Sequence, residues 1–326
     1  MVLNAVGSPL VARDLPDVAP AAGEVRVRIE ACGVCRTDLH VVDGDLARVI
    51  VPTIPGHEIV GIVDKVGTGV SNLEAGQRVG VPWLGSACGA CEYCRADREN
   101  LCDAPAFTGY TRPGGFATHV NARADFCIAL PDDADPVATA PLLCAGLIGW
   151  RCLVRAGDAK RLGLYGFGAA AHIVAQVARW QGREVYAFTR LGDARGQGFA
   201  RALGAVWAGP SSEPAPVPLD AAILFAPVGA LVPSALRAVR KGGRVICGGI
   251  HMSDIPEFPY RLLWEERELV SVANLTRADA RAFFGIVPKA GIRTTTTVYR
   301  LADANRALAD LRAGAFEGAA VLVPDV

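Results

Sequence analysis

Four cysteines within one short segment form the densest group of reactive side chains in the sequence. The segment CGACEYCRADRENLC spaces them as Cys-x2-Cys-x2-Cys-x7-Cys, at Cys88, Cys91, Cys94 and Cys102. Four thiolates this close together can form a tetrahedron around Zn²⁺ and leave no position for a substrate. In the rival bacterial ferredoxin run the fourth cysteine follows after three residues and precedes a proline, whereas here the gap is seven and Asp103 follows. The spacing favours structural zinc over an iron–sulfur cluster or unrelated thiols.

Cysteine and histidine side chains elsewhere in the chain suggest a second, open metal site. Cys35, His57 and Cys144 offer two sulfur ligands and one nitrogen ligand, and a catalytic zinc keeps its fourth position for water or substrate. These residues are far apart in the sequence, so their spacing is weak evidence. On the residues alone, two ordinary buried cysteines and a core histidine explain the pattern equally well.

A glycine motif indicates a dinucleotide site. Gly166-x-Gly168-x-x-Ala171 follows the apolar run LGLY and precedes the helical run AAHIVAQVARW. In this strand-turn-helix context Gly166 permits a tight turn, Gly168 lets a pyrophosphate approach the helix N-terminus, and Ala171 lets the helix pack closely on the strand. A glycine turn that binds nothing is the alternative.

The end of the next predicted strand, EVYAFTR, indicates which nicotinamide cofactor binds. An NAD site places an acidic residue about 20 positions past the glycines, on the adenosine ribose. Here Thr189 and Arg190 occupy that place, and the next acidic residue is Asp193. A guanidinium suits a 2′-phosphate that a carboxylate would repel, so NADP(H) is favoured over NAD(H). The alternative is that Arg190 stacks on adenine while NAD binds.

The elements that must position these residues divide the chain in two. From Glu24 to Leu130, alternating runs such as EVRVRIEA and IVGIVDKVG predict short strands. From Ala145, apolar strands alternate with helical stretches, which predicts a doubly wound parallel sheet. The helix and strand patterns after Asn274 are expected to pack on the first half. We therefore predict a β-rich catalytic domain over 1–145 and 275–326 and a dinucleotide-binding domain over 146–274. The Pro/Ser-rich segment 208–218 is expected to be a surface loop between a helix and a strand.

Composition excludes several classes of protein. The chain has 326 residues, 51% of them hydrophobic, with 33 basic and 33 acidic side chains. This is no disordered protein, and no basic excess points to nucleic acid or an anionic membrane. The longest uncharged stretches, 136–150 and 221–236, fall short of the roughly 18 apolar residues of a spanning helix. No secretory signal pattern is present, so a soluble, cytoplasmic protein is expected.

Taken together in order, the motifs resemble those of one family. They are Cys-Arg-Thr-Asp-Leu-His, Gly-His-Glu-Ile-Val-Gly, the four-cysteine segment, Gly109-Tyr110-Thr111 and Leu143-Cys144-Ala145-Gly146. The set resembles the zinc-dependent alcohol dehydrogenases of the medium-chain dehydrogenase/reductase superfamily, and Val81-Pro82-Trp83-Leu84 resembles their microbial, yeast-like branch. The resemblance implies an α/β two-domain fold, with a GroES-like β-rich catalytic domain and a Rossmann domain. It also implies two zinc ions per chain, a catalytic one on Cys35, His57 and Cys144 and a structural one on the four clustered cysteines.

The resemblance assigns roles to the neighbours of the zinc ligands. Thr37 would pass the substrate's hydroxyl proton along a relay through the cofactor ribose to His40 and water. Asp38 would orient His57 from behind, and Glu58 would approach the metal during ligand exchange. Capping or surface positions are the alternatives for Thr37, Asp38 and His40.

Four further residues are interpreted, the first three of them by the same resemblance. Arg36 would bind the cofactor pyrophosphate. Family members often supply a second arginine where this chain has Gly318, and its absence is expected to weaken cofactor retention. Trp83 would narrow the alcohol pocket, with plain core packing as the alternative. Cys32 forms Cys-x2-Cys with Cys35, and a buried thiol is favoured over a redox pair.

These features predict an oxidoreductase that transfers a hydride between NADP(H), or NAD(H), and a small aliphatic or aromatic primary alcohol or aldehyde. A homodimer or homotetramer formed through the cofactor domain is expected. Two alternatives are an enone or quinone reductase, which normally lacks catalytic zinc, and a catalytically idle NADP(H)-binding sensor. Cys35, His57 and Cys144 argue against the first, and the relay pair Thr37 and His40 argues against the second.

Overall fold

The computed structural model describes residues 1–47 and 49–324, and contacts within it divide the chain into two units. The first comprises Met1–Cys144, Asn274–Arg281 and Thr294–Val326. The second comprises Ala145–Ala273 and Ala282–Arg293. Helix α8 (Arg277–Ala290) therefore begins in the first unit and ends in the second.

The first unit is built on a seven-stranded sheet in which β14, β15, β1, β2, β3 and β7 follow one another and β6 also pairs with β1. Its strands are β1 (Glu24–Val34), β2 (Glu58–Val66), β3 (Arg78–Val81), β6 (His119–Arg123), β7 (Ile128–Ala129), β14 (Thr296–Arg300) and β15 (Ala319–Val323). In β1, Val25, Val27 and Ile29 lie buried, while Arg26 and Arg28 alternate with them. This period of two gives the sheet its apolar core face.

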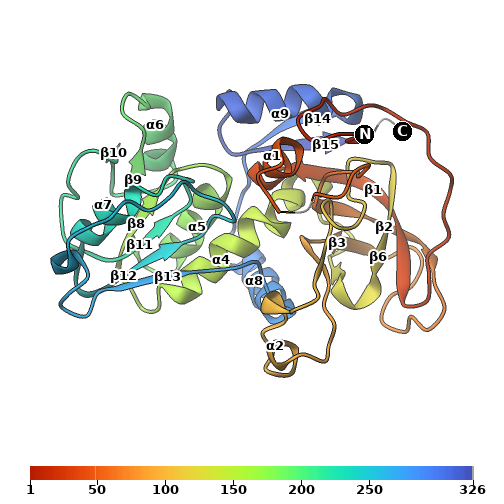
Figure 1. Cartoon of the computed structure of the whole chain (residues 1–326), viewed down its shortest axis with the longest axis horizontal. Helices are drawn as coiled ribbons and strands as arrows, with labels where there is room; N and C mark the ends of the chain where they lie inside the picture. Colours follow the sequence, from red (N-terminus) through yellow and green to blue (C-terminus); the bar gives the residue numbers. More distant parts are fainter. Residues whose placement is uncertain (48, 325–326) are drawn as a thin grey trace. The chain divides into compact units, whose positions relative to one another are not determined.

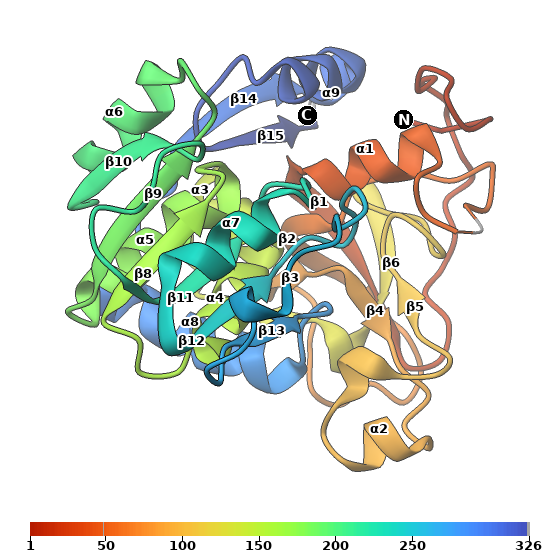
Figure 2. The same ribbon diagram turned by 60° about the vertical axis from the view of Figure 1, so that its left-hand side comes forward.

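Helices and turns of the first unit lie around this sheet. They are α1 (Arg36–Asp43), α2 (Glu92–Arg95), α3 (Pro136–Thr139), α9 (Ala304–Ala313), and the 3-10 turns η1 (Glu99–Leu101), η2 (Ala124–Phe126), η3 (Ala140–Leu143) and η5 (Leu301–Asp303). The late strand β15 pairs antiparallel with β1, and α9 packs against α1, so both ends of the chain complete one core. The four-cysteine segment carries α2 and extends beyond the small sheet of β4 (Leu84–Ser86) and β5 (Ala106–Phe107) (Figure 2).

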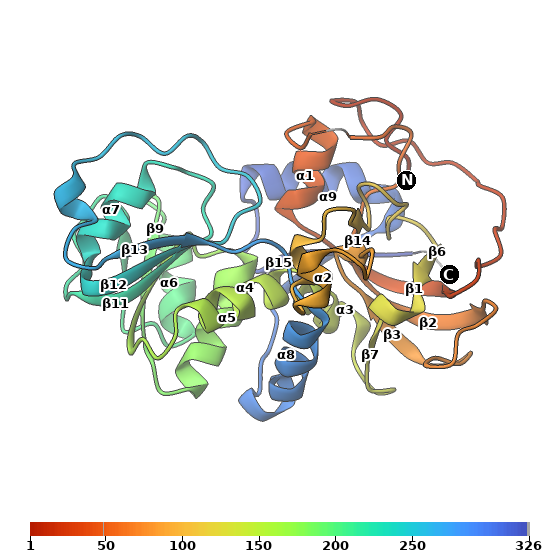
Figure 3. The same ribbon diagram turned by 60° about the horizontal axis from the view of Figure 1, so that its bottom comes forward.

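The second unit is a six-stranded, fully parallel sheet in the order β10-β9-β8-β11-β12-β13 (Figure 1). Its elements are α4 (Ala145–Arg155), β8 (Arg161–Tyr165), α5 (Ala169–Trp180), β9 (Glu184–Thr189), α6 (Ala194–Ala202), β10 (Trp207–Pro210), β11 (Leu219–Leu224), α7 (Leu231–Ala238), β12 (Val239–Cys247), η4 (Tyr260–Leu262) and β13 (Glu268–Ser271). Figure 3 shows α7 on one side of β11 and β12, and α4 and α5 on the other. This confirms the predicted doubly wound fold.

One connection differs from its prediction. Residues 208–210 are not loop, because they belong to β10, which pairs in parallel with the end of β9. The remaining segment, 211–218, joins β10 directly to β11 without a helix. The prolines of this segment correctly predicted a loop there. The short strand WAGP before the loop shows no clear period of two, so the pairing of this strand with β9 was not predicted.

Among the described helices, none is by itself long and apolar enough to cross a membrane. A bent pair, Pro136–Leu143 with Ala145–Arg155, reaches the required length and apolarity only together.

Candidate metal centres and cofactor loop

The dispersed cysteines and histidine meet in the first unit. One ligand atom each from Cys35, His57, Glu58 and Cys144 lies within 4.8 Å of all the others. Cys35 Sγ lies 3.1 Å from His57 Nε2 and 4.0 Å from Cys144 Sγ. Cys35 precedes α1, His57 precedes β2 and Cys144 follows η3, so three chain segments converge on one point.

The first turn of α1 holds Cys35 in place. Cys35 is the N-cap residue, and its Sγ accepts a hydrogen bond from the Thr37 backbone N–H at 3.3 Å. Asp38, three residues into the motif, accepts from the Cys35 backbone N–H at 2.9 Å and completes a reciprocal capping box. The local sequence therefore directs both the thiol and the carboxylate toward the cluster.

Asp38 also fixes the histidine. Its Oδ1 accepts hydrogen bonds from His57 Nδ1 and from the Gly56 backbone N–H, each at 3.0 Å, and both side chains are fully buried. The hydrogen bond at Nδ1 turns His57 Nε2 toward Cys35, as the nitrogen that would bind a metal ion. Burial disfavours the charged ring, but the negative charges of Asp38 and Cys35 outweigh it and raise the pKa of His57 well above its ordinary value.

The pKa values of the two thiols in this cluster shift in opposite directions. The hydrogen bond from Cys144 lowers the pKa of Cys35 well below its ordinary value, against the effect of burial. The same contact, together with burial, raises the pKa of Cys144. A metal ion bound between the two sulfurs would displace the proton of Cys144, because a thiol that coordinates a metal is deprotonated.

The donor set fits zinc. In a tetrahedron with Zn–S bonds of about 2.3 Å, two sulfur ligands stand about 3.8 Å apart. The separation of 4.0 Å between Cys35 Sγ and Cys144 Sγ is close to this edge. Two sulfurs and a nitrogen leave the fourth vertex for another ligand, as in an open zinc site. The carboxylate behind the histidine adds the usual support for such a ligand.

The four clustered cysteines also meet the geometry of a metal site. Their sulfurs lie within 4.8 Å of one another, and Cys88 Sγ is 3.9 Å from Cys94 Sγ. Backbone N–H groups of Ala90 and Cys91 donate to Cys88 Sγ and lower its pKa to about 6. Burial and the neighbouring sulfurs raise the pKa of Cys94 to about 12. With four sulfurs arranged in this way, the lobe fits a closed zinc site.

Glu58 lies in the same cluster as the first residue of β2 and is 1% exposed. Its side chain occupies the space above Gly33 on the paired strand β1, where an added Cβ would lie 1.8 Å from Glu58 Oε2. Glycine at position 33 is therefore required for the Glu58 carboxylate to reach the cluster.

The predicted relay residues lie on α1. Thr37 is half-buried, Arg36 is exposed, and His40 follows Thr37 by three residues on the same helix face. His40 Nδ1 lies 2.8 Å from Asp45 Oδ2, a pairing that the motif did not reveal because Asp45 lies beyond the helix. The carboxylate holds the imidazole ring in one orientation.

Trp83 lies beside the metal ligands. Its ring is edge-on to the His57 ring at 4.9 Å, stacks on Phe107 at 5.2 Å and lies parallel to Tyr110 at 5.8 Å. Sequence analysis missed Phe107 and the aromatic role of Tyr110, because nothing in their spacing relates them to Trp83. The three rings form an aromatic stack at one side of the cluster.

The glycine loop of the second unit has the expected form. Gly166 has a φ of 87°, and an added Cβ would lie 2.9 Å from the Ala226 backbone nitrogen. Gly168 is the N-cap of α5 without a side-chain cap, and the space where its Cβ would stand is open. Ala171 is fully buried against the sheet. An open helix N-terminus of this kind is a cradle that fits a pyrophosphate.

The end of β9 supplies a hydroxyl and a guanidinium. Thr189 is buried, and its Oγ1 donates to the Arg190 carbonyl at 3.2 Å and accepts from Gln197 Nε2 at 3.2 Å. Arg190 is exposed. Asp193, the nearest acidic residue, caps α6 by accepting from the Gly196 N–H at 2.9 Å. Its carboxylate is thus already committed to the helix.

Gly318 lies at the turn before β15 with a φ of 79°. A Cβ added there would stand 2.1 Å from the Thr295 carbonyl oxygen. An arginine at this position therefore needs a shift of the backbone, and the contact expected from the family is not restored by substitution alone.

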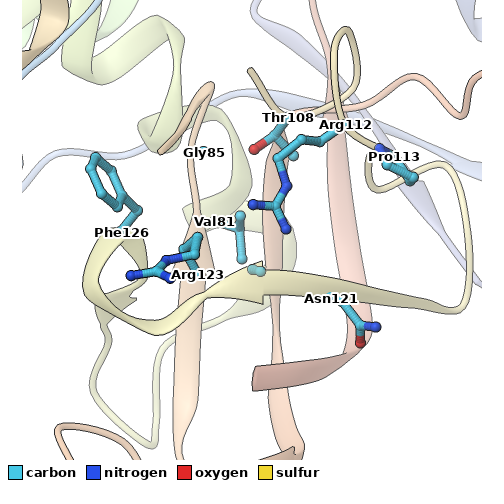
Figure 4. A pocket seen from close by; sticks show the side chains of 9 residues that line it. Val81, Gly85, Thr108, Arg112, Pro113, Asn121, Arg123 and Phe126 are labelled. Atoms are coloured by element: carbon cyan, nitrogen blue, oxygen red, sulfur yellow. The ribbon is translucent and has the colours of Figure 1, made fainter. Parts of the chain in front are cut away.

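A separate small hollow in the first unit is no substrate site. Its volume is about 10 Å³, room for a single water molecule. Arg112, Arg123 and Phe126 are among the side chains that line it (Figure 4).

Comparisons with known proteins agree with this geometry. Residues 21–132 match the alcohol dehydrogenase GroES-like domain. The chain is 49% identical over 312 residues to a probable alcohol dehydrogenase, AdhA, of Mycobacterium tuberculosis, covering 93% of this chain and 90% of the relative.

Two solved structures share the fold. The acetophenone reductase of Geotrichum candidum in complex with NAD has a TM-score of 0.89 at 25% identity, over 99% of this chain and 96% of that one. A putative zinc-binding dehydrogenase of Sinorhizobium meliloti bound to NADP has a TM-score of 0.86 at 25% identity, over 99% and 98%. Fold, motifs and identity agree along almost the whole length, and the chain belongs to the zinc-type alcohol dehydrogenase family of the medium-chain dehydrogenase/reductase superfamily.

Proposed function

We propose that this alcohol dehydrogenase transfers a hydride between NADP(H) and small aliphatic or aromatic primary alcohols and their aldehydes. The observation that carries the proposal is the convergence of Cys35, His57 and Cys144, with Asp38 hydrogen-bonded behind the histidine. A catalytic zinc on these three residues and a structural zinc on the four clustered cysteines are both part of the proposal. Zinc bound in the open site supplies a Lewis acid that lowers the pKa of an alcohol hydroxyl.

Residues of the chain itself are proposed to accept and transfer the hydroxyl proton of the substrate. Thr37 stands two residues after a proposed ligand, and its hydroxyl can accept the substrate's proton while donating its own onward. His40 lies one turn further along α1, with its ring oriented by Asp45, and is the group suited to exchange that proton with solvent. Asp38 keeps the proton of His57 on Nδ1 and so keeps Nε2 free for the metal. Glu58, buried beside the cluster, is proposed to approach the metal during ligand exchange.

The cofactor is proposed to lie on the glycine loop. Gly166, Gly168 and Ala171 would receive the pyrophosphate at the start of α5, and Arg36 would add a positive charge to it. Thr189 and Arg190 would hold a 2′-phosphate, because the nearest carboxylate, Asp193, is committed to capping α6. Two solved structures of this fold hold NAD and NADP respectively, and kinetics with each cofactor test the proposed preference.

The alcohol pocket is proposed to use the aromatic stack. Trp83 contacts His57 and is itself backed by Phe107 and Tyr110, so its ring cannot swing away to admit a bulky substrate. Its position supports small, apolar alcohols and aldehydes as substrates.

Domain roles and cellular context complete the proposal. We assign metal binding and proton transfer to the domain over 1–145 and 275–326, and cofactor binding to the domain over 146–274. A homodimer or homotetramer and a cytoplasmic location are proposed as well. None of the ten cysteines, all of which the structure describes, forms a disulfide, which fits a reducing compartment.

The first experiment measures metal content and turnover together. Zinc-replete enzyme is assayed with a panel of small aldehydes, including benzaldehyde, by the near-ultraviolet absorbance of NADPH and of NADH in separate reactions. Two zinc ions per chain and turnover that favours NADPH are expected. Tight NADPH binding and full zinc without turnover would instead support a sensor. A Cys144→Ser variant that keeps the structural zinc but loses turnover separates the two sites.

A further inference from the structure

A cavity of about 640 Å³ lies within the second unit, whereas the residues of both metal centres belong to the first unit. One wall is the connection 211–218, and the opposite wall is the end of α7 with the beginning of β12. We refer to this cavity, lined by 211–218, Tyr165, Ser234, 237–241 and Arg267, as the trough. Its volume is typical of sites that bind small organic molecules.

The trough exists because a helix is missing. Parallel strands are usually joined by a helix that covers one face of the sheet. The connection from β10 to β11 has Pro214, Pro216 and Pro218 in eight residues, and it crosses the face as an irregular chain. Ala215 and Val217 pack on the apolar core, but the space beside α7 stays open. The prolines, Ala215 and Val217 therefore supply an apolar stretch of the wall, which continues from the polar Ser211, Ser212 and Glu213.

The Tyr165 side chain closes one end of the trough. The side chain is 2% exposed, stacks on Phe188 at 4.1 Å, and lies over Gly163, where an added Cβ would be 3.4 Å from the ring. In the part of the chain that the structure describes, no hydrogen bond joins this hydroxyl to another group. Burial raises its pKa, so the hydroxyl stays a proton donor. A hydroxyl that lines the trough with its donor unused can hydrogen-bond an acceptor on a bound molecule.

Basic side chains surround the other end of the trough. Arg237, Arg240, Lys241 and Arg267 line it, against the single carboxylate of Glu213. Arg240 is held through Nε by Asp220 at 2.7 Å and through Nη1 by the Lys241 carbonyl at 2.9 Å. Arg267 donates through Nε to the Val239 carbonyl at 3.1 Å and through Nη1 to Glu265 at 3.1 Å. Lys241 pairs with Glu265 at 2.7 Å.

These contacts use only one edge of each guanidinium. The Nη2 groups of Arg240 and Arg267 donate to no atom of residues 1–47 and 49–324, and Arg237 is exposed without a described hydrogen bond. The two paired arginines are therefore fixed in orientation with donors left over. Fixed, planar donors of this kind favour carboxylate, sulfonate or phosphate groups.

We propose that the trough binds an organic anion with an apolar body. The acid group lies among Arg237, Arg240 and Arg267, the body lies against the prolines, and a polar atom near the far end accepts from the Tyr165 hydroxyl. The inference concerns a site that the hydride transfer does not use. Its basic end lies at the amino ends of β11 and β12, whereas the glycine loop follows the carboxyl end of β8. The six residues of β11 place the amino and carboxyl ends of these strands about 20 Å apart.

The opposite end of the trough approaches the cofactor. Ser211 lines it and donates its backbone N–H to the Thr189 carbonyl at 2.7 Å, at the strand end where the adenosine is proposed to bind. An occupant anchored at the arginines is therefore a neighbour of the cofactor rather than its competitor. Binding of the occupant, measured in the presence of saturating cofactor, distinguishes a neighbour from a competitor.

The test uses the full-length enzyme saturated with NADP⁺ and the fluorescent probe anilinonaphthalene sulfonate, an aromatic anion. Saturable binding of one probe per chain is expected. Arg237→Ala should weaken it about tenfold, and Tyr165→Phe, which keeps the ring stack, by roughly threefold to tenfold. Arg155→Ala is the matched control, because Arg155 also lies in the last turn of a helix of this unit, outside the trough. Unchanged circular dichroism verifies that each variant is folded.

Competition defines the ligand class. Octanoate should displace the probe, and inorganic phosphate at the same concentration should not, because it lacks the apolar body. Displacement of the probe by NADP⁺, equal affinity in the wild type and in Arg237→Ala, or displacement by phosphate as effectively as by octanoate would each overturn the proposal.

Discussion

Asp38 links the helix cap to the metal ligands at the scale of single residues. It accepts hydrogen bonds from Cys35 N, Gly56 N and His57 Nδ1, and it is fully buried. Asparagine has the same shape, but its amide can accept through only one atom. In Asp38→Asn, the side-chain NH2 group would face either the Cys35 N–H or the His57 Nδ1–H, so that two donors would meet without an acceptor.

We therefore predict that Asp38→Asn weakens zinc binding at the open site about tenfold to a hundredfold. The measurement is zinc content per chain during titration with a chelator, where one zinc should leave early and the zinc of the four cysteines should remain. Asp43→Asn, on the exposed end of the same helix, is the control and should behave like the wild type. Parallel loss of both zinc ions in Asp38→Asn would contradict the prediction.

A second prediction at this scale concerns Arg190. If its guanidinium binds the 2′-phosphate, Arg190→Gln should lower kcat/KM for NADPH by roughly tenfold or more and leave kcat/KM for NADH nearly unchanged. Arg190→Lys keeps the positive charge, so its kcat/KM for NADPH should fall less than that of Arg190→Gln. If Arg190 only stacks on adenine, both cofactors should lose efficiency equally, and steady-state kinetics with each cofactor decide between these results.

At the scale of elements, α5 carries a buried ionisable group in its first turn. His172 is fully buried, and burial lowers its pKa to about 4, although the Ala169 and Gly168 carbonyls partly oppose this. The unfolded chain has a histidine pKa of about 6.5. Between these values the unfolded state binds a proton that the folded state excludes, so stability falls as the pH falls.

We predict that this group makes the free energy of unfolding drop by about 1.4 kcal/mol per pH unit from about pH 6.5 down to about pH 4, and contributes no slope above that range. Asp220, whose pKa is lowered to about 2 by contacts that outweigh its burial, stays charged in this window. Urea unfolding of wild type and His172→Gln across the range measures the difference. Equal slopes for the two proteins would show that the histidine is protonated in the folded state.

The four-cysteine lobe and the start of α8 are coupled through one carboxylate. Buried Glu99, in η1 of the lobe, accepts at Oε1 from the Arg277 backbone N–H at 2.9 Å and from Arg277 Nε at 3.2 Å. The Arg277 guanidinium in turn lies 4.8 Å from the Phe126 ring centre. Thr276 and Asp279 cap the same helix end by mutual hydrogen bonds.

Removal of zinc from the lobe should therefore loosen the first turn of α8 as well as the lobe. We expect amide hydrogen exchange in 277–281 to accelerate after chelation, while exchange in α9 stays unchanged. Glu99→Gln, with zinc retained, should reproduce the effect in α8 but not in the lobe. Exchange that rises only in the lobe would show that the two elements are independent.

At the scale of the whole molecule, sequence patterns predicted the two kinds of architecture. Alternation in EVRVRIEA produces β1 with its buried valines, and the strand-helix alternation after Ala145 produces the parallel sheet. Both follow from periodicity, which is a local property of the chain. The connection 211–218 and the short strand before it were assigned less well, because four residues are too few to establish a period.

The sequence by itself determined the chemistry available to this protein: the zinc-type spacing of the four cysteines, the glycine fingerprint, and the absence of an acidic residue at the end of β9. Only the tertiary structure decided that Cys35, His57 and Cys144 meet, that Asp45 orients His40, that Trp83 stacks on Phe107 and Tyr110, and that the trough is open. The physical reason is that these contacts join residues far apart in the sequence or in different elements. They depend on strand pairing and side-chain packing, which no local spacing encodes.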